Sequence, residues 1–343
     1  MPILYIGQLW EGGTARERMK VLNRLGHSTV PFDVTPFAGS VPRVLQSIAC
    51  RFNAGPVVSR MNRALRREVG GLQGVTHIWV DKGVWIYPET LQHLKKVTGA
   101  QAIHYTLDSQ IVSQRSRHFM SSIPLYDAVV TTKEWEVDAY KRAGATRVML
   151  TYQGYDSRFF PRKVGGSELA AFGSDVCFVG HQQPHYAERL KAISSLNIGL
   201  RVWGDAWPRY AEKNPWARRI VGRGLWGESY PVALACAKIG LGLLGKHIPE
   251  TSTTRTFEIP AMGTFLLAER TALHQQLFDE GKEADFFSSD EEMLDKTRFY
   301  LRHEDARNRI AAAGRARCER SGYSSRDLLK RILDTVQRPE PVR

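Results

Sequence analysis

The sequence predicts an α/β protein of two Rossmann-like domains that face each other, each with a parallel sheet. Short apolar runs alternate with helical patterns along most of the 343 residues, and this βα order is typical of parallel sheets with helices on both faces. A polar stretch containing Pro161, Gly165 and Gly166 interrupts the alternation, which then restarts. A chain of this length is also long enough for two ordinary domains.

The first half of the chain is expected to hold six strands and four helices. Thr14 is a good N-cap residue for the first helix, which follows a glycine-containing loop. The second, basic helix is expected to break near Gly55 and Pro56. Strands are expected at 3–6, 29–32, 77–80, 102–106, 128–131 and 147–152, and helices at 14–25, 45–69, 88–97 and 133–143.

Three charged residues follow expected strands in this half. Glu11, Lys82 and Asp108 each come shortly after an apolar run. Because ligands of open parallel sheets bind at the carboxyl ends of the strands, the three side chains are expected to face one crevice.

The polar stretch 154–173 is expected to link the domains, and four strands and six helices are expected after it. The domain boundaries predicted are 1–160 and 170–320, followed by a C-terminal helix and tail, 321–343, that could cross back to the first domain. The strands are 176–179, 200–203, 239–244 and 264–268; the helices are 186–195, 231–237, 254–262, 290–301, 304–318 and 324–336.

Composition favours a soluble cytoplasmic protein. Apolar residues make up 43% and charged residues 24%, no run approaches the ~18 apolar residues of a membrane span, and the N-terminus lacks the features of a signal peptide. Four distant cysteines without a CxxC pair argue against a disulfide framework or a zinc cluster.

Positive charge is concentrated in the first half. The net charge is +13, of which residues 1–163 carry 22 − 12 = +10. Such a field attracts phosphates, anionic glycans, an anionic membrane surface or nucleic acid, although it also serves solubility alone. We find no helix-turn-helix, zinc-finger or RNA-recognition signature, so a nucleic-acid partner is not expected.

Two sequence patterns are misleading. Residues 240–246 match both GxGxxG and GxxxxGK, but the glycines lie inside an apolar strand that follows a helix. A phosphate loop should instead follow a strand and open a helix.

The sequence has no common metal-binding motif, since no Asp-x-Asp or His-Glu-x-x-His occurs. We therefore expect no metal and no nicotinamide or other cofactor.

The stretch from Glu250 to Leu267 is the most informative. Hydroxyl residues crowd an expected helix start, where free N–H groups favour an anion. Arg255 adds a planar cation suited to phosphate, and the Glu258 carboxylate could accept two ribose hydroxyls. An ordinary capped helix with an Arg255–Glu258 pair would explain the same residues.

This stretch resembles the C-terminal signature of CgeB-like, spore-maturation-protein-type glycosyltransferases. The likeness runs from Arg255 to Arg270 and on through Leu277-Phe278 and Gly281-Lys282-Glu283, with weaker similarity at 153–156 and 177–180. The resemblance implies a GT-B fold, a nucleotide-sugar donor on the second domain, an acceptor mainly on the first, and transfer without a metal. We expect the donor to be of UDP type. The resemblance also implies that Glu258 binds the donor ribose and that Glu250, which precedes it in an E-x7-E spacing, lies near the donor sugar.

Roles for the other candidate residues follow from the chemistry of transfer. Stabilisation of the leaving diphosphate is assigned to Thr254, Arg255 and Thr256, with Gly180 and His181 as a second candidate group. An inverting enzyme needs a general base, for which Asp108 is the first choice and Glu11 the second; a retaining enzyme needs neither. The nucleobase of the donor is expected near Trp203, Gly204 and Leu225. The acceptor is expected near Gly12, Gly13 and Lys82.

We therefore expect a metal-independent glycosyltransferase that acts on a glycan, lipid-linked or protein acceptor, with possible peripheral contact at the inner membrane face. A nucleotide-sugar epimerase, a basic nucleic-acid-binding or DNA-modifying protein, and a catalytically silent module with the same fold are the alternatives.

Overall fold

The computed structural model describes residues 2–39, 41–218 and 220–337. They form two compact units. The first unit is the chain up to Tyr152 together with the chain from Arg326 onward, and the second unit is Gln153–Ser325. Each unit is built around one sheet of six parallel strands.

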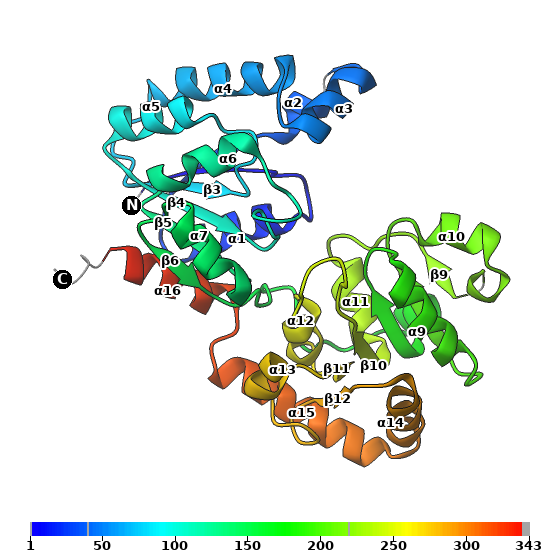
Figure 1. The fold of residues 1–343 in the computed structure, drawn as a ribbon. Coiled ribbons are helices and arrows are strands. Elements are labelled where there is room, and N and C mark those ends of the chain that lie inside the picture. Colours follow the sequence, from blue (N-terminus) through cyan, green and yellow to red (C-terminus); the bar gives the residue numbers. More distant parts are fainter. Residues whose placement is uncertain (1, 40, 219, 338–343) are drawn as a thin grey trace. The chain divides into compact units, whose positions relative to one another are not determined.

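The sheet of the first unit has the strand order β2-β1-β3-β4-β5-β6 (Figure 1). Its strands are β1 (Ile3–Gly7), β2 (Thr29–Asp33), β3 (His77–Asp81), β4 (Gln101–Thr106), β5 (Ala128–Thr131) and β6 (Val148–Leu150). β1 pairs with β2 on one side and with β3 on the other. The chain therefore adds β2 on one side of β1 and then crosses to the other side to add β3. This reversal is the switch point at which such sheets bind ligands.

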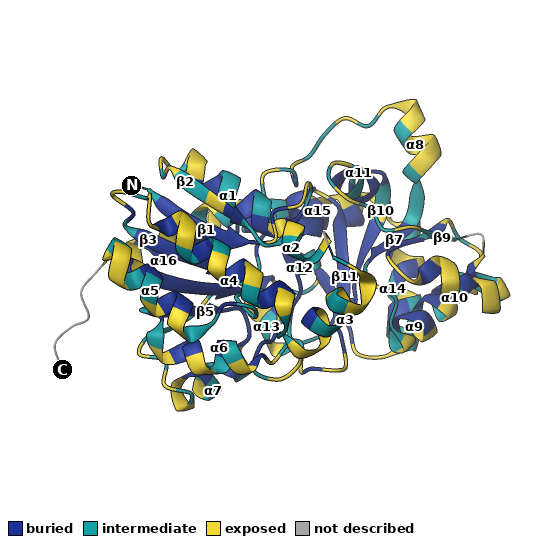
Figure 2. Cartoon of the chain, turned by 90° about the horizontal axis from the view of Figure 1, so that it is seen from above, coloured by how far each residue is buried: buried dark blue, intermediate teal, exposed yellow. Residues whose placement is uncertain are grey.

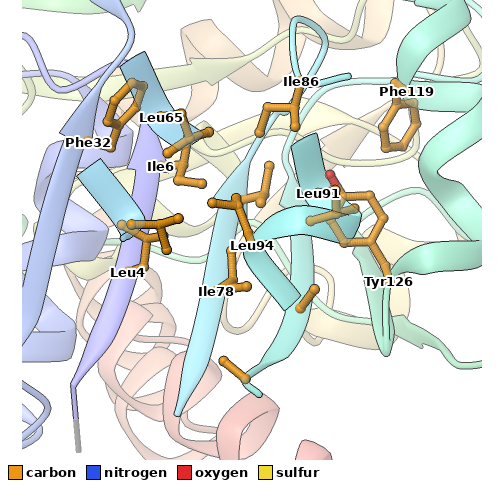
Figure 3. Packing of buried hydrophobic residues seen from close by; sticks show 14 of the residues in the cluster. Leu4, Ile6, Phe32, Leu65, Ile78, Ile86, Leu91, Leu94, Phe119 and Tyr126 are labelled. Carbon is orange, nitrogen blue, oxygen red and sulfur yellow. The ribbon is translucent and has the colours of Figure 1, made fainter. Parts of the chain in front are cut away.

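Helices cover both faces of this sheet. One face packs against α4, α5 and α6 through a core that includes Ile6, Leu65, Leu91 and Phe119 (Figure 3). The other packs against α1 and α16. The helices are α1 (Thr14–Arg24), α2 (Thr35–Gly39), α3 (Arg43–Phe52), α4 (Pro56–Val69), α5 (Pro88–Thr98), α6 (Arg117–Ser122), α7 (Val137–Arg142) and α16 (Ser325–Val336), with short 3-10 turns at Ile123–Leu125 and Glu134–Glu136.

The sheet of the second unit has the order β12-β11-β10-β7-β8-β9. The strands are β7 (Ser174–Val179), β8 (Leu200–Trp203), β9 (Val221–Gly222), β10 (Ala237–Gly242), β11 (Phe265–Glu269) and β12 (Asp285–Phe287). The switch point lies between β7 and β10, which are adjacent although two strands separate them in sequence.

The strands of this sheet are buried between helices with exposed outer faces (Figure 2). Residues of α9, α14 and α15 pack on one face, and α11 and α12 contact β7, β10 and β11. The helices are α8 (Gly166–Phe172), α9 (Pro184–Ser194), α10 (Trp207–Lys213), α11 (Ser229–Ala235), α12 (Arg255–Ala261), α13 (Ala272–Leu277), α14 (Asp290–Arg302) and α15 (Glu304–Arg320), with a 3-10 turn at Pro215–Ala217.

The structure corrects several expected elements. The stretch 154–173 is not a plain linker, because it contains α8 and belongs to the second unit, which begins at Gln153. Helices α2, α6, α10 and α13 and strands β9 and β12 were not expected. The C-terminal helix α16 packs in the core of the first unit through Leu329, Ile332 and Leu333; residues 338–343 of the expected tail lie outside the described residues.

Candidate active site

Arg255 joins the two strands at the switch point of the second unit. As the first residue of α12, it donates from one guanidinium nitrogen to the Val179 carbonyl at 3.2 Å and from the other to the Leu243 carbonyl at 2.6 Å. These carbonyls close β7 and follow β10, respectively. The guanidinium also lies over the Phe178 ring, 5.1 Å from its centre. Arg255 therefore fixes the two loops that border the switch point.

Two buried polar atoms at this place have no hydrogen-bond partner among the described residues. They are Nε of Arg255 and Oγ1 of Thr253, the latter two residues before the start of α12. Buried polar groups are usually paired, and at the edge where parallel sheets bind ligands these two atoms are candidates for contact with a polar ligand.

Glu258 lies one turn further along α12 and is buried, with 6% of its surface exposed. The Tyr230 hydroxyl donates to its Oε2 at 2.6 Å. Burial raises the pKa of Glu258 to about 7, and the charge of Asp156 adds to the rise, while hydrogen bonds from Tyr230 and Thr254 and the charge of Arg255 oppose it. Burial removes water from this carboxylate, which costs free energy. The carboxylate is therefore a strong hydrogen-bond acceptor for the hydroxyl groups of a ligand.

Thr256 is buried in the interior, away from the edge where a ligand would bind. Its side chain is fully buried, and its Oγ1 accepts from the Thr253 amide at 3.1 Å and lies 2.9 Å from Nε2 of His274. His274 Nδ1 lies 2.6 Å from the Glu269 carbonyl, which can only accept, so Nε2 accepts the Thr256 hydroxyl proton. The expected contact between the Thr256 hydroxyl and a diphosphate is therefore replaced by an internal hydrogen bond.

Thr254 and Arg255 keep their place at the start of α12, but the helix itself differs from the expected one. It has seven residues and contains Pro260, and Thr254 makes no side-chain cap to the main chain. Thr254 instead acts on Glu258, whose pKa it helps to lower. The charged and polar side chains, more than the helix dipole, therefore determine what this edge binds.

The loops after β7 and β8 are packed against each other at two glycines. A Cβ on Gly204, whose φ is 154°, would lie 1.9 Å from the Gly180 carbonyl, and a Cβ on Gly180 would lie 2.9 Å from the Arg255 guanidinium. The Trp207 indole donates to the Gly180 carbonyl at 2.9 Å. Both expected glycines are thus required by close approach of the backbone.

The remaining candidates of the second unit have different surroundings. His181 is exposed, and Leu225 is half-buried in the segment between β9 and α11. Trp203 is buried at 8% exposure, with its ring near Gly222 and Phe172, which makes it a packing residue. Glu250 accepts from the Gly245 amide at 2.7 Å.

The glycines of residues 240–246 serve packing. A Cβ on Gly240 would lie 2.7 Å from the Ile259 side chain of α12, and a Cβ on Gly242 would lie 2.7 Å from that of Ala268. Lys246 pairs with Glu269 at 2.5 Å. These glycines are therefore explained by close packing around β10 and not by phosphate binding, as their position inside the strand indicated.

The first unit brings together two of its candidates. Lys82 and Asp108 form an ion pair at 2.9 Å, each partly exposed. Glu11 is exposed in a turn and joins no ion pair that the described residues show. Gly12 has φ 80°, and a Cβ on Gly13 would lie 2.8 Å from the Trp10 ring; these glycines shape the turn that starts α1.

Sequence reasoning missed several residues of these sites. Tyr230 reaches Glu258 from a segment 28 residues away in sequence, and no local pattern marks it. Asp156, whose charge acts on Glu258 from 102 residues away in sequence, lies in the weakly similar stretch 153–156, but nothing there pointed to Glu258. In the first unit, Arg18 forms a two-bond pair with Asp81 at 2.8 and 3.0 Å beside Lys82. The position of Asp81 at the end of an apolar strand was the available signal.

Known proteins resemble the chain in fold and in part of the sequence. Residues 185–334 match a family described as glycosyl transferase-like. The match covers 150 of the 343 residues, so it relates this part of the chain, and not the whole of it, to that family. Sucrose-phosphate synthase from Thermosynechococcus elongatus has a similar structure (TM-score 0.67, 15% identity, 98% of each chain covered). So does a glycosyltransferase from Rickettsia africae (TM-score 0.65, 13% identity, covering 98% of this chain and 97% of that chain).

A third similar structure is Anabaena Alr3699/HepE in complex with UDP and glucose (TM-score 0.63, 12% identity, covering 98% of this chain and 99% of that chain). These likenesses confirm the expected GT-B fold. No curated protein matches the chain by sequence.

None of the helices described for residues 2–39, 41–218 and 220–337 has the length and apolarity needed to cross a membrane.

Proposed function

We propose that this protein is a glycosyltransferase. It would transfer a sugar from a UDP-sugar, bound at the switch point of the second unit, to an acceptor bound by the first unit. The observation that carries the proposal is the buried Glu258 carboxylate beside orphaned polar atoms of Arg255 and Thr253. Glu258 would accept the ribose hydroxyls, and the polar atoms would face the diphosphate. The Anabaena structure that holds UDP supports a uridine nucleotide.

In the proposed reaction the chain's own groups stabilise the leaving diphosphate. Negative charge grows on the diphosphate as the glycosidic bond breaks, and fixed donors or cations are worth about 3 kcal/mol each in such a position. Arg255 supplies a positive charge and the free Nε–H. Asp108, oriented by the Lys82 ammonium, would take the proton of the acceptor hydroxyl in an inverting transfer. No step of this proposal uses a metal or a cofactor.

The finer assignment within the GT-B enzymes is the CgeB-like group, on the resemblance from Arg255 to Arg270. We place the protein in the cytoplasm, with acceptors that are glycans, lipid-linked sugars or proteins. Peripheral binding to an anionic membrane is supported by exposed arginines on α3 and α4 and by Val44 and Phe52, which are 70% and 65% exposed.

A thermal-shift panel with UDP, GDP, CMP, ADP and dTDP tests the donor site. A ligand at 100 times its dissociation constant stabilises by about 2.7 kcal/mol, so UDP should raise the melting temperature most. The shift should persist in EDTA, and full loss with rescue by Mg²⁺ or Mn²⁺ would refute the metal-free proposal. Turnover of a UDP-sugar without any acceptor would favour the epimerase, and an absence of binding to every nucleotide would favour a silent module.

A further inference from the structure

The first unit has a cavity at its own switch point. This cavity, of about 340 Å³, is lined by the end of β1, by the loop after β3 and by the C-terminal end of α3. β1 and β3 are the neighbouring strands at which the direction of the chain reverses, which is where parallel sheets bind ligands. All residues that line the cavity belong to the first unit.

The lining combines an apolar part with cations. Met61, Ile86 and Trp85 supply apolar surface, and Arg51, Lys82 and Arg115 supply positive charge. Asp81, also part of the lining, is already paired with Arg18, and Lys82 is paired with Asp108. Arg51 and Arg115 are exposed, and neither has a carboxylate partner among the described residues. The cavity is therefore positively charged overall.

The wall formed by residues 82–87 is fixed by side chains from other elements. Gln110 donates to the Lys82 carbonyl, and Asn62 donates to the Trp85 carbonyl at 2.8 Å while accepting from the Tyr87 amide at 2.9 Å. Lys82 itself has φ 73°, which costs a residue with a side chain about 1–3 kcal/mol. Strain held in place by buried hydrogen bonds is typical of binding sites.

We propose that this cavity binds a phosphate monoester carried by the acceptor, with Arg51 and Arg115 contacting the phosphate and the apolar part contacting the body that bears it. The acceptor role rests on the proposed function. A phosphate offers three oxygens and up to two negative charges, so it satisfies two guanidinium groups and the Lys82 ammonium together, whereas a carboxylate offers two oxygens. A soluble sugar phosphate and a lipid phosphate both present this group.

Cys50 provides a direct readout, because it lines the cavity and is the one exposed cysteine of the four. Its alkylation by iodoacetamide, which is uncharged, is followed by mass spectrometry at constant ionic strength. Glucose 6-phosphate should slow the alkylation and glucose should not. Arg51→Gln and Arg115→Gln should each raise the half-protecting concentration about tenfold, the usual effect of losing one charge-assisted hydrogen bond.

Arg117→Gln is the matched control, since Arg117 is exposed two residues from Arg115 but does not line the cavity; its half-protecting concentration should equal that of the wild type. Phosphatidylcholine vesicles with and without phosphatidic acid distinguish a lipid phosphate from a soluble sugar phosphate as the group bound. Protection by the phosphatidic acid vesicles alone, with the same dependence on Arg51 and Arg115, assigns the phosphate to a lipid.

Three results would overturn the proposal: an unreactive Cys50, equal protection by glucose and glucose 6-phosphate, or an effect of Arg117→Gln as large as that of Arg115→Gln. Because the test uses no nucleotide, its failure is distinct from failure of the donor site. Protection of Cys50 without any UDP binding would leave the phosphate site standing and remove only its role as the acceptor site.

Discussion

Replacing Glu258 with glutamine should make the protein more stable above neutral pH. The folded protein holds this carboxyl with a pKa of about 7, against an ordinary value of 4.5. Between these values the folded form binds a proton that the unfolded form has released, so wild-type stability falls as the pH rises through this window. Glutamine has no such proton and still accepts the hydrogen bond of Tyr230.

The size of the effect follows from the same two values. The window spans about 2.5 pH units, and each unit corresponds to about 1.4 kcal/mol. The free energy of unfolding of Glu258→Gln, minus that of the wild type, should therefore rise by about 3 kcal/mol between pH 4.5 and pH 8. Titrations of other groups cancel in this difference when both proteins carry them unchanged.

Urea unfolding at pH 4.5, 6 and 8, followed by tryptophan fluorescence, measures the difference. Glu212→Gln is a suitable control, because Glu212 is exposed on α10, and its difference from the wild type should stay flat. A flat difference for Glu258→Gln over the same range would show that the carboxylate is solvated, and the interpretation of Glu258 as a buried functional carboxylate would be wrong.

Three further substitutions test other parts of the account. Arg255→Lys loses the fork that joins two loop carbonyls and should lower kcat more than UDP affinity; equal losses in both would assign Arg255 to ground-state binding. Asp108→Asn should lower kcat at least ~100-fold without changing the dissociation constant of UDP, and unchanged turnover would indicate a retaining reaction or another base. Gly204→Ala should destabilise the protein by several kcal/mol in thermal unfolding, since its Cβ would overlap the Gly180 carbonyl; wild-type stability would contradict the close approach.

Much of the architecture could be predicted from the order of apolar runs. The strands of both sheets that exceed three residues coincide with such runs, because parallel strands buried on two faces are continuously apolar. The elements that were missed are short. Helices α2 and α13 have five and six residues, too few for a helical period to show, and their formation depends on packing against distant segments.

The site could be predicted only where its signal is local. Arg255 and Glu258 lie on one helix, and their spacing was informative. Thr256 looked equivalent to Thr254 in sequence, but His274, 18 residues later, takes its hydroxyl as a hydrogen-bond partner. Tyr230 likewise reaches Glu258 only because α11 and α12 both lie near β10. Pairings of this kind depend on tertiary packing and leave no spacing in the sequence.

Isothermal titration of UDP into the wild type and Glu258→Ala at pH 8 tests the central claim most directly, with Glu212→Ala as the control. The account predicts UDP binding by the wild type and the control, and at least ~10-fold weaker binding by Glu258→Ala with its fold retained, since two hydroxyl hydrogen bonds to a carboxylate are lost. Equal affinity in all three proteins would contradict it.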